Sequence, residues 1–399
     1  MVQVIRLAVP FVVLIAYCFS WNARAEQIVV WHQKNGATPF LEAMLAPVAD
    51  AYSMDLSVTY ISTTNLKTAL IKAVMNKNEP NIALVPSDFF GEHKTLRLQP
   101  ISQELKNKVK LDQETWEFAT VDKVVYGIPL AVGNHLMMYF NKERVKTPLN
   151  DWQSLIEQSK NMPDGQHLIG WNYNELYWFI NFIPMFGDSP VKSGKINLQQ
   201  PAVANALKFY KGLTESNVID RSCEYACSLK RFEKNDISYL ISGDWAYKEL
   251  KYKMGDSLGI TTLPAYKGVP MNSFYSAMAL IFPGDQQSEK EKTINYRLAE
   301  ILISKQVQSR LFDETGMLPA SLDLRKAGLQ VKSSDFETIS TIIENGIELP
   351  STPTMSAAWA GLRKGFDYYH SNEVSATQAT KIMQQAAERQ LSKLQAKQN

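Results

Sequence analysis

Several spacings that catalysis commonly uses are absent from this 399-residue sequence. No H-E-x-x-H, no G-x-G-x-x-G and no complete phosphate-binding loop is present. Ser193-Gly194-Lys195 resembles the end of a phosphate loop, but Ser189 stands where its first glycine belongs. The five histidines lack metal-ligand spacing, so we expect no metal and no cofactor. Paired carboxylates for glycoside hydrolysis stay open as an alternative, although nothing marks any pair.

The first 25 residues have the features of a cleaved secretory signal peptide. Arg6 supplies a positive charge, the run 7–19 is almost purely apolar, and Ala23-Arg24-Ala25 has the small-x-small pattern of a cleavage site. The run is shorter than the ~20 residues that a membrane anchor needs. We therefore expect residues 1–25 to be removed, Glu26 to begin the mature chain, and the protein to reside in the periplasm.

The cysteines are consistent with export. Cys18 falls in the signal segment, and Tyr17 before it disfavours a lipid anchor, which needs a small residue there. Cys223 and Cys227 remain as a pair, and an oxidising compartment favours a disulfide between them over two free thiols. So short a loop must be non-helical or distorted, because disulfide geometry limits how far apart the two Cα atoms can lie.

Composition narrows the class of partner. The 42 basic and 40 acidic residues nearly cancel, which argues against a nucleic-acid or anionic-membrane surface. The mature chain is long enough for two ordinary domains. Eight tryptophans and 17 tyrosines supply core volume, and they also supply flat faces on which a sugar ring could stack.

The hydrophobic pattern predicts alternating strands and helices at the front of the mature chain. A strand–helix–strand–helix–strand order gives a parallel sheet with right-handed crossovers, and ligands bind outside the carboxyl ends of such strands. The expected elements are a strand at 28–31, a helix at 38–52, a strand at 56–61, a helix at 65–75 and a strand at 82–85.

A second α/β region follows a predicted crossing between two lobes. Two apolar runs, 127–132 and 136–140, flank Gly133-Asn134, which can absorb unusual backbone angles. Beyond them we expect helices at 151–159, 177–185 and 202–213, strands at 168–171, 237–242, 259–263 and 277–282, and a helical C-terminus through 376–394.

Several segments in one order resemble the family 1 extracellular solute-binding proteins, in particular their maltose/maltodextrin-binding branch. Any single segment is a weak match, but together they span nearly the whole mature chain. They are IVVWHQKNG, NIALVPSDFFG, VVYGIPLAVGNHLMMYFNK (124–142), WNYNELYWF (171–179), FEKNDISYLISGDWAY (232–247), ITTLPAYKGVP (260–270) and LPSTPTMSAAWAGLR (349–363).

The resemblance implies roles for three aromatic residues. Tyr177, Trp245 and Trp359 match residues that stack on glucose faces in that branch. The alternative for each is an ordinary core position, which is the more common place for a lone tryptophan. The family register favours the binding role for these three, leaves Trp178 open, and leaves three tryptophans as structural: Trp31, Trp152 and Trp171.

Polar ligand contacts are implied in the same way. Glu175 matches a carboxylate that binds sugar hydroxyls, Arg363 a basic residue beside the ligand, and Asp88 an acidic contact from the first lobe. Asn35 falls where the branch has an acidic contact, and its amide can still donate and accept hydrogen bonds.

The first lobe departs from the maltose pattern more than the second. Val85 and Phe89 replace a tryptophan and an arginine, Gly133-Asn134 replaces a glutamate, and Ala360 replaces an aromatic residue. We expect Phe89 to restore some stacking surface as a ligand-binding residue. The departures put maltose itself in doubt and leave room for another oligosaccharide.

The fold that the resemblance implies is α/β, a two-lobed periplasmic binding protein with doubly wound sheets and a hinge that the chain crosses more than once. The expected N-lobe takes residues 26–133 and 279–330. The expected C-lobe takes residues 134–278 and the helical segment 331–399.

The function implied is that of a monomeric, non-enzymatic binding component of an ABC importer. It would capture an oligosaccharide between the lobes and deliver it to permease subunits in the inner membrane. Three alternatives stay open at this point: the same fold with a non-maltose sugar or a non-sugar solute, a periplasmic glycosidase, and a sensor subunit.

Overall fold

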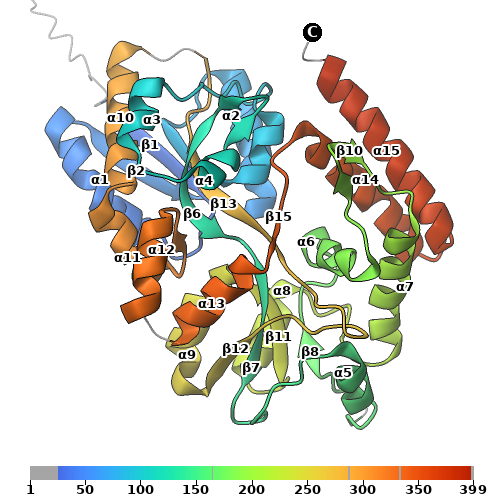
Figure 1. Cartoon of the computed structure of the whole chain (residues 1–399). Helices are drawn as coiled ribbons and strands as arrows, with labels where there is room; N and C mark the ends of the chain where they lie inside the picture. Colours follow the sequence, from blue (N-terminus) through green and yellow to red (C-terminus); the bar gives the residue numbers. More distant parts are fainter. Residues whose placement is uncertain (1–25, 164, 286–287, 332–333, 397–399) are drawn as a thin grey trace, which may run out of the picture.

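The computed structural model describes residues 26–163, 165–285, 288–331 and 334–396. These residues form two α/β lobes, each with its own sheet, and the chain passes between them more than once (Figure 1). The predicted signal peptide, residues 1–25, lies outside the described residues. The predicted two-lobed fold is confirmed.

The N-lobe is built on one mixed sheet. The strand order is β14 (Leu318–Pro319), β6 (Gly127–Gly133), β13 (Phe274–Ile281), β3 (Ile82–Pro86), β1 (Gln27–His32) and β2 (Asp55–Tyr60), with β15 (Ile347–Glu348) paired to β13. Strand β1 is parallel to both of its neighbours, β2 and β3. This confirms the strand–helix–strand–helix–strand order predicted for the front of the mature chain.

Helices cover this sheet with their apolar faces. Helix α1 has the predicted bounds, Thr38–Tyr52, and ends where Ser53 takes a left-handed conformation with φ 53°. Its buried residues, among them Leu41 and Leu45, pack in one core with Ile28 and Val30 of β1. The other helices of this lobe are α2 (Thr63–Asn76), α3 (Gln103–Lys108), α4 (Gln113–Glu117), α10 (Glu289–Leu302), α11 (Lys305–Thr315) and α12 (Leu322–Val331).

The C-lobe has a smaller sheet of order β12 (Leu258–Thr261), β7 (Leu136–Asn141), β11 (Tyr239–Gly243) and β8 (Ile169–Gly170). The helix predicted over 177–185 is broken: α6 (Leu176–Phe179) gives way to two 3-10 turns, the second beginning at Pro184. Proline cannot continue an α-helix without losing a backbone hydrogen bond. The other helices are α5 (Trp152–Ser159), α7 (Pro201–Glu215), α8 (Tyr225–Glu233) and α9 (Tyr247–Met254).

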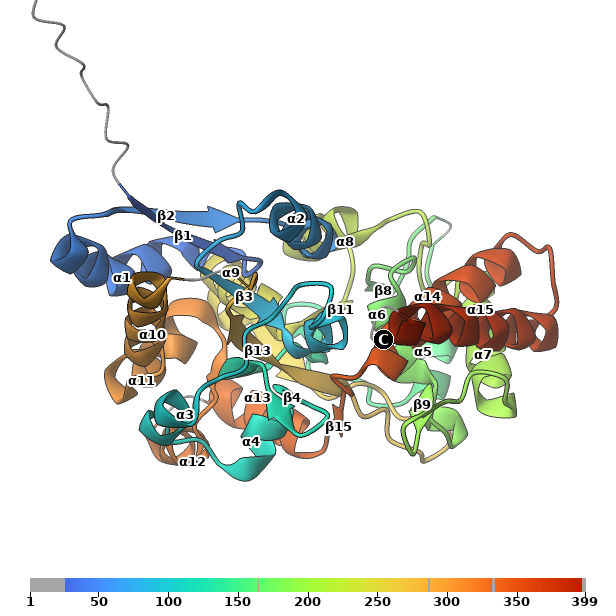
Figure 2. The same ribbon diagram turned by 90° about the horizontal axis from the view of Figure 1, so that it is seen from above.

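The C-terminal helices α14 (Pro353–His370) and α15 (Ala376–Ala396) return to the C-lobe and pack closely on each other (Figure 2). Gly361 makes this approach possible, because a Cβ there would lie 2.3 Å from the Met383 carbonyl oxygen. Met355, Leu362 and Met383 join the same core as Trp152. The packing fixes the face of α14 that carries Trp359.

The lobes meet where β6 runs into β7, where β12 is followed by β13, and beside β15. Strand β13 spans the boundary expected at residue 278, since its N-lobe pairing begins before it, with Ser276 opposite Gly133. We therefore propose that the N-lobe return segment starts at about residue 274. Helix α13 (Ser334–Glu344) lies between the lobes and contacts β12 as well as α12.

The predicted disulfide between Cys223 and Cys227 is present, with 5.1 Å between the Cα atoms. Cys223 lies ahead of α8 and Cys227 lies in its first turn. The loop is thus non-helical in its first half, as its length requires.

Gly133 is the residue on which the β6–β7 crossing depends. Its φ is +152°, and a Cβ there would lie 2.1 Å from Asp244 Oδ2 of the C-lobe. We expect Gly133→Ala to destabilise the protein by about 1–3 kcal/mol, because it forces a strained backbone and displaces Asp244. Thermal unfolding would measure the loss.

Gly212→Ala is the matched control for this prediction. Gly212 lies within α7 and has no neighbour within 4 Å of an added Cβ. Alanine there should be neutral or stabilising by about 0.5–1 kcal/mol. Equal melting temperatures for the two variants would contradict the role given to Gly133.

Candidate functional site

The aromatic residues predicted to bind ligand converge from three elements of the C-lobe. Tyr177 lies on α6, Trp245 on the turn after β11, and Trp359 on α14. The Tyr177 ring centroid is 6.1 Å from that of Trp245 and 6.4 Å from that of Trp359, with an interplanar angle of 28° to the latter. All three rings are half-buried.

Hydrogen bonds fix two of these rings and leave one donor free. The Tyr177 hydroxyl donates to the backbone oxygen of Asn134 at the lobe crossing and lies 3.4 Å from that of Phe274. Trp245 Nε1 donates to the Tyr225 hydroxyl at 3.1 Å. Trp359 Nε1 is buried and has no acceptor among the described residues. A buried N–H without an acceptor is costly, so it is suited to donate to a ligand.

Other tryptophans lie in the core. Trp152 and Trp171 are 0% and 1% exposed, as expected for structural residues. Trp178 is also buried, donates from Nε1 to the Ile241 carbonyl at 2.8 Å, and meets Trp245 edge-on at 5.8 Å. Trp178 therefore packs against Trp245 from the core side and does not itself face the site.

Charged groups flank the aromatic cluster on one side. Arg363 Nη2 lies 3.8 Å from Glu175 Oε1, and Arg363 Nη1 donates to the Asn174 carbonyl at 2.9 Å. Arg363 is one helical turn beyond Trp359 on α14, so the two share a face. Both charged side chains are partly exposed, which leaves them able to bind ligand hydroxyls.

The N-lobe residues predicted to bind ligand are less uniform. Burial raises the pKa of the Asp88 carboxyl, and the positive charge of Lys67 opposes that shift. Asp88 also lies near enough to Tyr177 for its negative charge to add to the effect of burial, which raises the phenol pKa. Asn35 is exposed on the loop after β1.

Phe89 lies in the N-lobe core, where only 4% of it is exposed. The Lys67 ammonium covers its ring at 4.7 Å from the centroid. With its ring buried and covered, Phe89 offers no open face for stacking. The structure therefore places no stacking surface at Phe89, where the sequence predicted one.

A buried charged cluster between the lobes was not among the predicted site residues. Lys34 of the N-lobe is 5% exposed, and its Nζ has no hydrogen-bond partner among the described residues. Burial lowers the Lys34 pKa to about 8, the Asp244 charge opposes this shift, and Lys248 adds to it. The signal available in the sequence was adjacency: Lys34 precedes Asn35, and Asp244 precedes Trp245.

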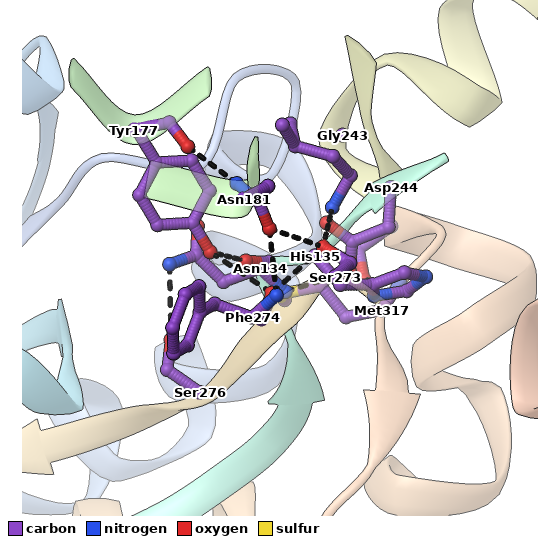
Figure 3. A network of polar contacts seen from close by, with 12 residues as sticks. Asn134, His135, Tyr177, Asn181, Gly243, Asp244, Ser273, Phe274, Ser276 and Met317 are labelled. Atoms are coloured by element: carbon purple, nitrogen blue, oxygen red, sulfur yellow. Dashed lines mark hydrogen bonds and ion pairs between the residues drawn. The ribbon is translucent and has the colours of Figure 1, made fainter. Parts of the chain in front are cut away.

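Asp244 also contacts the segment that crosses between the lobes. Its Oδ2 accepts from the Asn134 backbone N–H at 3.1 Å and lies 3.8 Å from His135 Nδ1 (Figure 3). Burial lowers the pKa of His135, and the charge of Asp244 opposes that effect. Neither nitrogen of His135 has a hydrogen-bond partner among the described residues.

Asn181 ties the aromatic cluster to the returning strand (Figure 3). Its Oδ1 accepts from the Phe274 N–H at 2.7 Å, and its Nδ2 donates to the Tyr177 carbonyl at 2.6 Å. Ser273 Oγ donates to Asn181 Oδ1 at 3.2 Å and accepts from the Leu136 N–H at 2.7 Å. These hydrogen bonds link the crossing between the lobes to α6.

The lobes also touch at the edge beside α14. Ser356 Oγ donates to Glu92 Oε1 of the N-lobe at 2.8 Å. Gly91 packs against the start of α14, where a Cβ would lie 2.8 Å from the Thr352 carbonyl oxygen. The site thus lies between surfaces that are in contact at both the crossing and this edge.

Residues 255–259 have the sequence pattern of a hydrolase nucleophile elbow but not its backbone geometry. Residues 255–259 read G-x-S-x-G, which in hydrolases places a serine on a turn from strand to helix. Here a 3-10 turn, Gly255–Ser257, leads instead into β12, and Ser257 Oγ donates to Glu143 Oε1 at 2.8 Å. This segment does not form a nucleophile elbow.

Residues 43–337 match the family model described as bacterial extracellular solute-binding protein. The chain belongs to this family. Within the described residues of this solute-binding protein, no helix is both long and apolar enough to cross a membrane. The relatives matched by these comparisons are named as binding proteins.

The individual relatives are also solute-binding proteins by name. The maltodextrin-binding protein MdxE of Bacillus subtilis (strain 168) is 23% identical over 309 residues, 71% of each chain. The maltose/maltodextrin-binding domain MalE from Bdellovibrio bacteriovorus, solved with maltotriose, has 26% identity and a TM-score of 0.84, covering 92% of this chain and 100% of that one. The maltose-maltodextrin binding protein of Alicyclobacillus acidocaldarius, 18% identical with a TM-score of 0.78 over 91% of this chain and 100% of that one, shares the fold.

The buried Lys34 predicts a pH dependence of stability. Its pKa in the folded protein is about 8, against 10.5 ordinarily. As pH rises from about 8 towards 10.5 the folded chain releases a proton that the unfolded chain keeps, so stability rises in this window. We expect the melting temperature of the wild type to rise relative to that of Lys34→Met between about pH 7 and about pH 9.5.

Lys110→Met is the control, because Lys110 is exposed on the N-lobe. Its melting temperature should follow that of the wild type across the same pH range. A constant difference between wild type and Lys34→Met would mean that Lys34 keeps its ordinary proton affinity in the folded chain.

Proposed function

We propose that this chain is the periplasmic binding component of an ABC importer and that it takes an oligosaccharide of the maltodextrin type. The observation that carries the proposal is the convergence of Tyr177, Trp245 and Trp359, with ring centroids 6.1 and 6.4 Å apart. Names of relatives that bind maltodextrin or maltotriose support the same ligand class.

The chemistry of a pyranose suits these side chains. Its C–H faces are apolar, and an aromatic ring that covers one contributes roughly 0.5–1.5 kcal/mol, by analogy with aromatic pairs. Its hydroxyls need partners once buried, because an unpaired one costs about 1–3 kcal/mol. Glu175 and Arg363 supply charged partners, and Trp359 Nε1 supplies a buried donor without an acceptor among the described residues.

Binding would need no chemical step. None of the proposed contacts requires a nucleophile or a general acid, so we propose that the protein is not an enzyme. Ligand bridging the two lobes would favour the closed arrangement through contacts made only there. Permease subunits in the membrane would then receive the ligand, after export directed by residues 1–25.

The altered N-lobe side bears on which sugar is bound. Phe89 is in the core, Asn35 carries no charge, and Asp88 has a raised pKa. An oligosaccharide other than maltose is therefore the second candidate, with contacts concentrated on the C-lobe. A non-sugar solute would leave the aromatic cluster without a use.

A thermal-shift screen of the mature protein against maltose, maltotriose, longer maltodextrins and unrelated oligosaccharides tests the proposal. Ligand at about 100 times its dissociation constant should stabilise the folded chain by about 2.7 kcal/mol. We expect Trp359→Ala to abolish this shift with little change in the ligand-free melting temperature. Trp359→Phe should retain part of the shift, because it keeps an aromatic face, although a smaller one, and loses the indole N–H.

Tyr252→Ala is the matched control, since Tyr252 is 90% exposed and lies on α9. It should bind as the wild type does. A large loss of ligand-free stability in Trp359→Ala would favour a core role for this residue. The absence of any shift with the whole panel would reject an oligosaccharide ligand, and release of shorter products from maltohexaose would indicate a glycosidase.

A further inference from the structure

The disulfide loop, residues 223–227, lies beside the aromatic cluster. Its Cα atoms are 5.1 Å apart at the bridge, and Cys223 is buried. A short loop has little chain entropy for a disulfide to remove compared with a long one. The bridge therefore adds little stability through chain entropy, and its main effect is on the residues that the loop holds in place.

The middle of the loop contacts Trp245. Tyr225, in the middle of the loop, accepts a hydrogen bond from Trp245 Nε1 at 3.1 Å. Its ring lies 6.1 Å from that of Trp178, which in turn meets Trp245 at 5.8 Å. Tyr225 thus determines how the Trp245 indole is turned.

A second path leads from the loop to Arg363. Glu224 Oε1 accepts from Asn174 Nδ2 at 3.3 Å. The Asn174 carbonyl accepts from Arg363 Nη1 at 2.9 Å, beside the 3.8 Å approach of Arg363 to Glu175. Two residues of one small loop therefore reach candidate ligand residues on two different elements.

The start of α8 explains why a covalent bond is needed here. Glu224 occupies the N-cap position, and its side chain makes no capping hydrogen bond. A helix end without a side-chain cap frays readily, because its first N–H groups lack partners. The first helical residue is Tyr225 itself, so fraying would move the partner of Trp245.

The loop is also attached to the sheet side of the C-lobe. Ser228 Oγ donates to the Cys223 carbonyl at 2.8 Å and lies 3.2 Å from the Trp171 carbonyl oxygen. This contact holds the Cys223 end of the loop. The disulfide then transfers that fixed position to Cys227 and closes the uncapped first turn.

We propose that the Cys223–Cys227 disulfide is a positioning element of the ligand site, which holds Tyr225 and Glu224 so that Trp245 and Arg363 face the ligand. The inference rests on the proposed oligosaccharide function and deepens it. It predicts that loss of the bridge lowers ligand affinity by more than the accompanying loss of stability explains.

The test compares ligand dissociation constants and melting temperatures for Cys223→Ser/Cys227→Ser and Tyr225→Phe, with maltotriose or whichever oligosaccharide the screen identifies. Tyr225→Phe keeps the disulfide and removes one hydrogen bond, so its dissociation constant should rise about threefold to tenfold. The serine variant should lose at least as much. Combining the changes should give less than the product of the separate effects, since both act through Tyr225.

Three controls separate positioning from general destabilisation. Tyr252→Phe deletes an exposed hydroxyl and should bind normally. Ile294→Ala removes a buried side chain of α10 in the N-lobe, and should lower the melting temperature without changing the dissociation constant. Dithiothreitol should weaken binding by the wild type and leave the serine variant unchanged.

A readout without ligand keeps this inference distinct from the proposed function. The indole N–H resonance of Trp245 in a ¹⁵N–¹H spectrum should shift in both Tyr225→Phe and the serine variant, while that of Trp152 stays in place. If the wild type binds no oligosaccharide, the proposed function fails and the resonance still decides the positioning role. An unmoved Trp245 resonance, or unchanged affinity in Tyr225→Phe, overturns the inference even where the serine variant does not fold.

Discussion

Backbone polar groups buried at the lobe crossing must find hydrogen-bond partners, because water does not reach them and an unpaired group is costly. Side chains of the C-lobe meet much of this requirement. Tyr177 pairs with the Asn134 carbonyl, Asn181 with the Phe274 N–H, and Asp244 with the Asn134 N–H. The same side chains, or their sequence neighbours, form the candidate site, so its geometry follows from the crossing.

The charged residues near this crossing differ in how far they are exposed to water. Arg363 and Glu175 remain partly exposed, where water reduces the cost of their charges. Lys34 and Asp244 are buried, and there an ionised lysine is held at a pKa of about 8 by desolvation that its neighbour only partly offsets. Such a buried charge depends on the lobes staying together, which makes Lys34 sensitive to how closely they approach.

The aromatic side of the site rests on helix packing and on one short covalent loop. Trp359 reaches Tyr177 because the close contact of α14 with α15 at Gly361 presses α14 against the C-lobe. Trp245 depends on Tyr225, which stands at the uncapped start of α8. The C-lobe thus presents a packed set of rings, whereas the N-lobe offers Asp88 and the exposed Asn35.

Hydrophobic periodicity in the sequence predicted both bounds of α1, because the side chains that repeat with the helical period are those that the core buries, but it missed the break after α6. The cysteine spacing likewise determined the disulfide. Tertiary structure alone decided that Phe89 is covered by Lys67 and that Lys34 is buried within range of the Asp244 charge. These outcomes depend on contacts between residues far apart in the chain, and local pattern carries no information about which distant side chain fills a given space.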